Sequence, residues 1–425
     1  MKLTSYWLDT STPFSAAAQG APQGAADVVV AGAGFTGLTA ALMLARKGAN
    51  VVVLEAGRVA SEASGRNGGM CNNGFAQDYY GMSQLLGVER ANTLYRAFDA
   101  GVDLVETLVA EENIDCHFRR VGKFKVAAKP EHYDKLVRSQ ALMAQHVDPN
   151  TRMVPRGEQR AEIGSDHYYG GMLMEKSAAM HMGRFGQGLA EAAARRGARI
   201  YENSPAVGLR RIQGREYEVR TPNGSVHAKQ VLLATGTSAV GPLGWFRRRI
   251  VPVGAFLIAT EPLPVEMLDR LTPRRRNTTD TRNFVSYFRT THDNRILFGG
   301  RARFAASNTV SDQKSGAILR ASMIRVFPEL KDARIDYCWG GMVDMTQDRL
   351  PKAGERDGLY YSMGYSGHGT QMSVHMGSVM ADVMDGKLER NPWKDDAWPA
   401  IPGYTGWPWF LPFVGLYYRY RDHVS

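Results

Sequence analysis

The chain has 425 residues, of which 44% are hydrophobic and 22% charged, which is ordinary for a globular protein with a large core. The length predicts about two or three domain-sized units. Its three cysteines, Cys71, Cys116 and Cys338, include no Cys-x-x-Cys pair, which excludes a disulfide framework and a zinc ribbon and favours a cytoplasmic protein with reduced thiols.

The formal net charge is +10, and short arginine clusters at 210–211, 247–249 and 274–276 supply much of it. Such an excess attracts anions. No zinc finger, RNA-recognition or basic-helix pattern accompanies it, so we expect a solvated surface and no nucleic-acid partner.

Membrane features are few in the sequence. The first residues lack the apolar core of a secretory signal, and no run of about 18 apolar residues predicts a spanning helix. An aromatic run at 407–420 favours packing on its own domain, but leaves a peripheral membrane or partner contact open.

The first part of the chain alternates strands and helices. Residues 9–26 are rich in Ala, Ser, Gly and Pro and are expected to form a lead-in segment. Periodicity then predicts, in chain order, a buried strand at 27–31, a helix at 37–48 that ends at Gly48, a strand at 51–54, a helix at about 83–112, a strand at 123–128 and a helix at 131–146.

The second part begins and ends with the same alternation but has a different middle. It is predicted to contain a helix at 181–197, a buried strand at 229–234, mainly β-like segments from about 247 to 338, a strand at 358–364 and a helix at 367–386. This order implies a doubly wound parallel sheet that is interrupted by a second, more antiparallel sheet.

A dinucleotide fingerprint joins the first strand to the first helix. Its residues are Gly32, Ala33, Gly34, Phe35, Thr36 and Gly37. Gly32 allows a tight turn, Gly34 lets the backbone approach a pyrophosphate, and Gly37 permits close packing of helix on strand. The helix N-terminus offers free N–H groups to the phosphates. Glu55 ends the second strand, where its carboxylate would accept hydrogen bonds from the adenosine ribose.

A second glycine-rich loop follows that strand and favours FAD over NAD. Its residues are Ala63, Ser64, Gly65, Arg66, Asn67, Gly68 and Gly69. The glycines leave backbone donors free, and Ser64 and Arg66 can meet a phosphate. The sequence contains no second nucleotide fingerprint, so NAD bound beside FAD is not predicted.

These motifs give the chain a resemblance to the D-amino-acid-oxidase-type FAD-dependent oxidoreductases. The resemblance also rests on LLATG at 232–236 and GYSGHGTQ at 364–371. Within the superfamily the chain is most similar to the gamma-glutamylputrescine oxidoreductase branch. The residues that carry this are Ser5, Tyr6, Trp7, Leu8, the ASGRNGG loop, Trp339, Gly340, Gly341, Thr346, Asp348, Arg349 and Pro351.

The resemblance implies an α/β fold, α+β overall, in which a Rossmann-like FAD-binding domain carries an inserted, mainly antiparallel β-sheet substrate domain. We expect the FAD-binding domain at 1–118, 178–246 and 339–390, the substrate-binding domain at 119–177 and 247–338, and a C-terminal aromatic tail at 391–425.

The chemistry that the resemblance implies is oxidation of a small-molecule amine or amino acid. A hydride passes to flavin N5, the imine hydrolyses, and oxygen or another electron acceptor reoxidises the flavin. The FAD is expected to be non-covalent, because Gly341, Met342 and Val343 occupy the stretch where sarcosine oxidases carry their flavin-linked Cys. No Lys can be placed over the flavin, so oxidase and dehydrogenase both stay open.

The resemblance also extends the expected site. Its further FAD contacts are Ala56, Val207, Thr235, Gly236, Gly364, Ser366, Gly367, His368, Gly369 and Thr370. Tyr287, Phe288, Arg301, Trp339 and His368 are the candidates for the substrate pocket or catalysis. Strand aromatics are more often core than substrate wall. Arg301 follows Gly299 and Gly300 at a strand end, where it could pair with a substrate carboxylate or, equally, form a salt bridge on the sheet surface.

Three other functions remain as alternatives. A tRNA-modifying flavoprotein would share this fold and a basic surface, and its tRNA binding would weaken with salt. A flavin-binding interaction protein would use residues 407–420 for docking. A membrane-associated dehydrogenase would pass electrons to a quinone.

Overall fold

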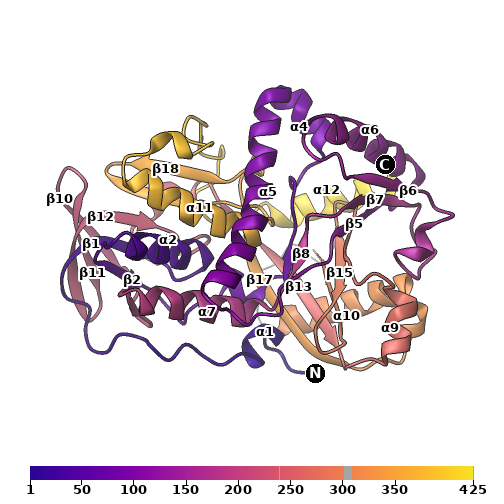
Figure 1. Cartoon of the computed structure of the whole chain (residues 1–425), viewed down its shortest axis with the longest axis horizontal. Helices are drawn as coiled ribbons and strands as arrows, with labels where there is room; N and C mark the ends of the chain where they lie inside the picture. The colour runs from indigo at the N-terminus through magenta and orange to yellow at the C-terminus, as the bar shows by residue number, and fades with distance from the viewer. Residues whose placement is uncertain (239, 301–308, 425) are drawn as a thin grey trace.

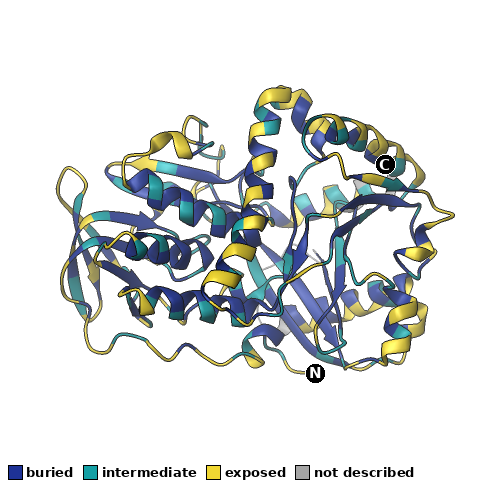
Figure 2. Cartoon of the chain, in the orientation of Figure 1, coloured by how far each residue is buried: buried dark blue, intermediate teal, exposed yellow. Residues whose placement is uncertain are grey.

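Two sheets form the two halves of the molecule, and the long helix α5 (Val88–Glu111) stands between them (Figure 1). The computed structural model describes residues 1–238, 240–300 and 309–424. Both sheets are buried, whereas the hairpin of β10 (Gly208–Gln213) and β11 (Glu216–Thr221) is exposed at the far end of the first half (Figure 2).

The first sheet is the predicted doubly wound sheet. In the described residues its order is β10, β11, β12 (Gly224–Leu233), β1 (Gly24–Ala31), β2 (Val51–Leu54) and β9 (Arg199–Tyr201), with β19 (Leu359–Met363) beside β12 and β18 (Lys352–Arg356) beside β19. The strands β19, β12, β1, β2 and β9 are parallel. The continuous valine runs of β1 and β2 are buried because the sheet is covered on its faces.

Helices cover the first sheet at its centre. Helix α2 (Phe35–Arg46) packs against α7 (Met182–Arg195) on one side and α11 (Gly369–Met384) on the other, and α11 also contacts α5. Gly48 follows α2 with a φ of +85°, which fits its predicted place just beyond the helix.

The second sheet is the predicted inserted sheet. In the described residues its order is β17 (Ile335–Met345), β13 (Val251–Thr260), β16 (Ile296–Gly300), β15 (Ser286–Thr290), β14 (Asn277–Asp280), β5 (Lys123–Val126), β7 (Gly171–Met174) and β6 (Arg152–Val154). All neighbours are antiparallel except β5 and β14, which are parallel.

Three sequence-based boundaries need correction. The expected division between residues 338 and 339 falls inside β17, which pairs with β13 from Ile335 to Met345, so the second sheet continues to residue 345. The helix expected at 83–112 is two helices, α4 (Tyr79–Leu86) and α5, because Gly87 between them has a φ of +79°. Helix α10 (Thr309–Val326) lies in the stretch that was expected to be mainly β-like.

The remaining described elements are short or peripheral. They are α1 (Tyr6–Asp9), α3 (Ala63–Arg66), β3 (Met70–Cys71), β4 (Arg119–Arg120), α6 (Pro130–His146), η1 (Gln159–Ala161), β8 (Ala178–Ala179), α8 (Gly244–Arg247), α9 (Val265–Leu271), η2 (Pro328–Leu330), η3 (Leu388–Arg390) and α12 (Leu411–Val424). None of the helices in the described residues is long and apolar enough to cross a membrane. The cysteines at 71, 116 and 338 are all buried and unpaired.

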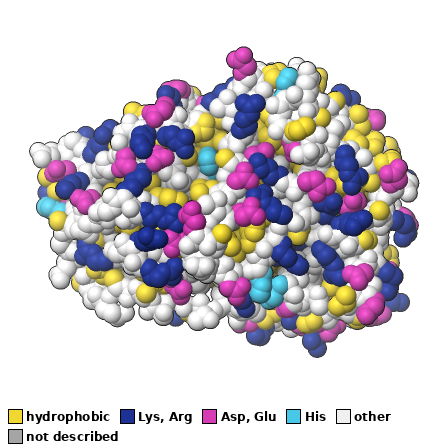
Figure 3. Space-filling model, in the orientation of Figure 1, with side chains coloured by type: hydrophobic (Ala, Val, Ile, Leu, Met, Phe, Trp, Pro, Cys, Tyr) yellow, Lys and Arg dark blue, Asp and Glu magenta, His cyan; other side chains and the backbone are white. Residues whose placement is uncertain are grey.

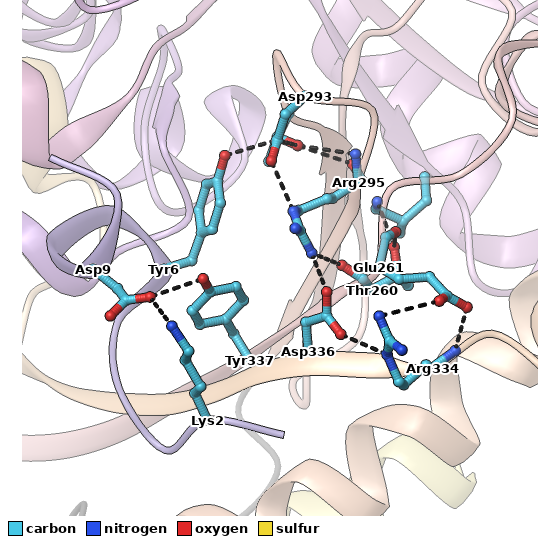
Figure 4. A network of polar contacts seen from close by, with 12 residues as sticks. Lys2, Tyr6, Asp9, Thr260, Glu261, Asp293, Arg295, Arg334, Asp336 and Tyr337 are labelled. Atoms are coloured by element: carbon cyan, nitrogen blue, oxygen red, sulfur yellow. Dashed lines mark hydrogen bonds and ion pairs between the residues drawn. The ribbon is translucent and has the colours of Figure 1, made fainter.

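The N-terminal leader ties the two halves together. It starts beside the second sheet, where Lys2 bridges to Tyr337, and then runs along the edge of the first half to β1 (Figure 1). The side chains of Tyr6 and Trp7 are fully buried on the way. Lys2 and Tyr337 both donate to Asp9, and Tyr6 donates to Asp293. Arg295 also donates to Asp293 and continues the network to Asp336 (Figure 4).

The positive charge does not form a single patch on the face shown in Figure 3, where Lys and Arg side chains alternate with Asp and Glu. Many of the arginines form ion pairs; the Arg276 guanidinium, for example, contacts both Glu162 and Glu175. The arginine cluster at 274–276 is therefore partly neutralised within the fold.

Candidate functional site

A cavity of about 1010 Å³ lies between the two sheets. The first sheet contributes the ends of β1, β2 and β12, and the second contributes β5, β13, β14 and β17. Ligands of doubly wound folds bind at the carboxyl ends of the parallel strands. Among the predicted site residues, the cavity is lined by Gly32, Gly34, Phe35, Thr36, Glu55, Ala56, Ser64, Arg66, Asn67, Gly68, Thr235, Gly236, Tyr287, Ser366, Gly367, His368, Gly369 and Thr370.

Four of the predicted glycines do not line the cavity but permit close packing around it. A Cβ at Gly37 would lie 1.9 Å from the Gly32 carbonyl oxygen, and one at Gly65 would lie 2.2 Å from the Ala60 carbonyl oxygen. Gly69 and Gly364 have positive φ, where a side chain would meet Trp7 or Thr346. These glycines therefore shape the loops instead of contacting the ligand.

Three of the other predicted site residues do not line the cavity. Trp339 is fully buried and does not line the cavity; its indole Nε1 donates to the Arg66 carbonyl at 3.0 Å. Phe288 stacks on Phe298 in the hydrophobic core of the second sheet. Val207 is 45% exposed and its N–H donates to the Arg220 carbonyl at 2.8 Å, and the expected contact of its backbone with adenine stays a prediction. Its neighbour Ala206 lines the cavity instead.

The aromatic candidates on strands divide between cavity and core, because the pattern of a strand does not reveal which of its faces meets a cavity. Tyr287, one residue from Phe288, does line it, and its ring is flanked closely by the backbones of Gly68 and Gly299. Arg301 lies outside the described residues.

At one end of the cavity, hydrogen bonds fix the residues of the dinucleotide fingerprint in place. The Glu55 carboxylate accepts from the Ala33 N–H at 2.7 Å and from the Gly57 N–H at 2.8 Å, which fixes its orientation. Burial raises the pKa of Glu55. The N–H of Phe35, at the start of α2, donates to Ser64 Oγ at 3.0 Å, so the two glycine-rich loops contact each other at the helix N-terminus.

The second glycine-rich loop is held by neighbours distant in sequence. Ser5 Oγ donates to the Gly65 carbonyl at 2.6 Å, and Trp7 Nε1 donates to the Asn67 carbonyl at 2.7 Å. The Arg66 Nε donates to the Gly340 carbonyl on β17 at 2.7 Å. The SYWL and WGG segments are thus the supports of this loop, and the sequence alone did not reveal that role.

The loop before α11 forms the opposite end. Burial raises the pKa of Asp344 to about 6, and its carboxylate accepts from the Gly364 N–H at 2.6 Å. The Tyr365 hydroxyl joins this loop to α2 through Thr36 Oγ1 at 2.8 Å. Burial, followed by the charges of Lys123 and Lys125, lowers the pKa of His368 to about 3, so its imidazole is neutral near pH 7.

The cavity has the features that an FAD molecule needs. Thr235 Oγ1 and His368 Nδ1 are buried without a hydrogen-bond partner, which leaves polar atoms for a ligand to satisfy. Gly32 adopts a φ of +105°, and a Cβ there would lie 2.6 Å from the Ala234 carbonyl oxygen, so the tight turn after β1 requires glycine. FAD would be held by Gly34, Glu55 and Ser64 at one end and by the amides before α11 at the other.

Residues that sequence reasoning missed line the wall formed by the second sheet and α6. They are Lys123, Lys125, His132, Lys135, Asp280, Thr281 and Arg282. The alternation in KFKV was a usable signal, because residues two apart on a strand share a face. Nothing in the pattern around these residues indicates that this face meets the cofactor cavity.

The comparisons with known proteins identify the family. The family model described as FAD dependent oxidoreductase matches residues 27–383. The chain belongs to this family. FAD is therefore its cofactor, and the predicted D-amino-acid-oxidase-type fold is confirmed.

The relatives include two bacterial enzymes that match most of the chain. The chain is 34% identical over 371 residues to the probable oxidoreductase OrdL of Haemophilus influenzae, covering 86% of this chain and 84% of that protein. It is 31% identical over 408 residues to the gamma-glutamylputrescine oxidoreductase of Escherichia coli, covering 94% and 93%. Family members of this kind are amine and amino acid oxidoreductases, so this chain is an enzyme of that class.

Solved structures show the same fold at lower identity. Glycine oxidase from Geobacillus kaustophilus aligns with a TM-score of 0.73 and 20% identity, covering 90% of this chain and 99% of that one. L-Proline dehydrogenase from P. horikoshii aligns with a TM-score of 0.73 and 20% identity, covering 88% and 96%.

Proposed function

We propose that the chain oxidises the C–N bond of a gamma-glutamylated amine or a closely similar amine. The observation that carries the proposal is the continuous cavity that joins the dinucleotide fingerprint to a wall built by the second sheet. The likeness to gamma-glutamylputrescine oxidoreductase over 94% of the chain supports this choice among amines.

The bound FAD would accept the hydride that leaves the carbon next to the nitrogen. The nitrogen loses a proton, and the imine takes up water to give a carbonyl compound and an amine or ammonia. Oxygen or another acceptor then takes the two electrons. In this scheme the protein orients the substrate and excludes water, with Tyr287 as part of the substrate wall.

The carboxylates that line the cavity are Glu55, Glu62, Asp78, Asp280 and Asp344. Glu55 is held by two backbone amides at the nucleotide end, and Asp344 is held by the amides before α11. A substrate amine that binds in its neutral form, which burial in an apolar site favours, needs no protein base. His368, neutral at the start of α11, is a candidate to orient the bound flavin through its unpartnered Nδ1.

An anaerobic titration of the purified holoenzyme tests this function. The panel contains gamma-glutamylated putrescine, putrescine, sarcosine, and D- and L-alanine, with flavin absorbance as the readout. We expect bleaching by the gamma-glutamylated amine at the lowest concentration. Fast recolouring in air identifies an oxidase, and slow recolouring a dehydrogenase. If none of the amines bleaches the flavin, the proposal is wrong, and salt-dependent binding of tRNA is the next measurement.

One surface favours a second candidate, a dehydrogenase that docks on an anionic membrane and passes electrons to a quinone. Six large apolar side chains of the C-terminal segment are exposed by 56–75%: Trp407, Trp409, Phe413, Leu416, Tyr417 and Tyr420. The last four follow the i, i+3, i+4, i+7 spacing of one face of α12. Trp and Tyr suit a membrane interface, and the chain carries a net charge of +10.

Co-sedimentation with vesicles that contain phosphatidylglycerol tests this candidate. We expect binding by the holoenzyme and its loss in the double variant Phe413→Ser, Leu416→Ser, with bleaching by amines unchanged. The control is Leu85→Ser, which removes a leucine that is 72% exposed on α4. Failure of the holoenzyme to sediment, or loss of sedimentation in the control, would contradict membrane docking.

A further inference from the structure

Two lysines of β5 project into the cavity from one face of the strand. Lys123 and Lys125 both line the cavity, as their spacing of two residues requires. The strand lies inside the second sheet, between β14 and β7. Lys123 is only 4% exposed, and its Nζ donates to the Asn73 carbonyl at 3.3 Å.

Neither lysine forms an ion pair within the part of the chain that the structure describes. The carboxylates that act on these lysines, Asp99 on Lys123 and Asp78 on Lys125, already have other hydrogen-bond or ion-pair partners. Asp99 lies 3.6 Å from Lys176 Nζ and accepts from Asn73 Nδ2 at 3.2 Å, while Asp78 caps α4 by accepting from the Gly81 N–H at 2.7 Å. The cavity wall therefore contains two lysines without an ion-pair partner in the described residues, although the carboxyl groups of Asp78 and Asp280 line the same cavity.

Keeping such charges buried is costly, which points to a ligand that compensates for them. Burial of an unpaired ammonium group disfavours its charged form. Burial first, and the charge of Lys125 second, lower the pKa of Lys123 to about 7, and burial also lowers the pKa of Lys125. An anion between the two ammonium groups would reverse both effects. Other cationic side chains of the lining, Lys135 and Arg282, add to the positive field.

We propose that Lys123 and Lys125 form a subsite for a carboxylate of the amine substrate, which makes the enzyme selective for acidic amines. The inference rests on the proposed function, because a gamma-glutamylated amine carries its carboxylate at the end remote from the amine that is oxidised. The two ammonium groups bind that carboxylate, and the remote amine then reaches the flavin. Uncharged alkylamines lack this anchor.

The first test measures binding without turnover. Glutarate, a dicarboxylate without an amine, is titrated into the holoenzyme, and the change in flavin absorbance gives its dissociation constant. Each charge-assisted contact contributes enough that we expect Lys123→Met and Lys125→Met to weaken glutarate binding by roughly 10- to 100-fold. The variant Lys125→Arg should retain most of the affinity because it retains the charge. The control is Lys331→Met, which removes one exposed positive charge outside the cavity.

The second test separates anchoring from chemistry. For a gamma-glutamylated amine, Lys125→Met should raise KM by about tenfold or more with kcat changed by less than about threefold. For putrescine, which has no carboxylate, both constants should stay at their wild-type values. FAD content and melting temperature, measured on each variant, identify a variant that is misfolded; Lys125→Gln then replaces it.

The outcomes separate the subsite from the proposed function. If glutarate binds the lysine variants as tightly as the wild type, the subsite is wrong even if amines bleach the flavin. The subsite is equally wrong if the variants impair putrescine oxidation as much as oxidation of the acidic amine. If no amine bleaches the flavin but glutarate binding depends on both lysines, the proposed function fails and the carboxylate subsite stands.

Discussion

The indole Nε1 of Trp7 donates a hydrogen bond to the carbonyl of Asn67 at 2.7 Å, across sixty positions of sequence. Through this bond the N-terminal leader holds the second glycine-rich loop against the cofactor cavity. The Arg289 guanidinium lies 5.3 Å from the Trp7 ring and donates to the Gly69 carbonyl at 2.7 Å, so the same loop is also held from β15. Both halves of the molecule therefore fix the loop that lies next to the flavin site.

Replacing Trp7 with Phe should weaken FAD binding without unfolding the protein. The aromatic ring is largely kept, but the Asn67 carbonyl loses its donor, which costs about 1 kcal/mol, or roughly fivefold in affinity. Fluorescence of FAD released on dilution measures the effect. The matched control is Trp409→Phe, because the Trp409 side chain is 58% exposed. Equal FAD affinity in Trp7→Phe and the wild type would contradict this role.

The nucleotide half of the site could be predicted because its signals are local. The turn at Gly32, the helix start at Phe35 and the acidic end of β2 at Glu55 follow one another within a single β-α-β unit, so spacing alone places them together. The cavity lining contains all three.

The substrate half depends on pairing between distant segments, which spacing does not encode. Lys123 faces the cavity because β5 pairs with β14, where Lys123 lies opposite Asn277. No pattern near residue 123 predicts that β5 pairs with this distant strand. Trp339 was a candidate for the site through the family resemblance, but on β17 its side chain lies in the core. Alternation on a strand predicts two faces and does not say which one meets a ligand.

Glu55→Gln should lose FAD more readily than the wild type. The carboxylate accepts from two backbone N–H groups, whereas a Gln amide has one oxygen, so one N–H would face the new NH₂ group. We expect affinity for FAD to fall by roughly 10-fold or more, since hydrogen bonds to a charged acceptor are stronger than neutral ones. Equilibrium titration of the apoprotein measures it, with Glu216→Gln on the exposed hairpin as the control. An unchanged affinity would show that Glu55 does not position the fingerprint.

Asp422→Ala should alter substrate binding while leaving FAD in place. The Asp422 carboxylate on α12 accepts from the Asn283 and Phe284 backbone N–H groups, both at 2.9 Å, and Asn283 lines the cavity. Loss of these two hydrogen bonds should raise KM for the amine by about 3- to 10-fold with little change in FAD content. Steady-state kinetics test this, and Asp395→Ala, in the exposed segment before α12, is the control. A loss of FAD with unchanged KM would contradict the assignment.

His181 should make the stability of the protein depend on pH in the acid range. Its Nδ1 accepts from the Arg184 N–H at 3.2 Å at the start of α7, which requires the neutral ring. Burial, followed by the neighbouring His292, Arg184, Arg289 and His117, lowers the pKa of His181 to about 3.

Because the folded pKa lies below the unfolded value of about 6.5, the unfolded state binds more protons in between. The stability from neutral His181 is therefore complete above about pH 6.5 and is lost as pH falls toward 3. His181→Asn keeps an acceptor for the α7 N-cap and removes the titration. We expect the melting temperature of the wild type to fall more between pH 7 and pH 5 than that of His181→Asn, with His227→Asn, on the first sheet, behaving as the wild type. Parallel curves for the wild type and His181→Asn would show that protonation of His181 is not coupled to unfolding.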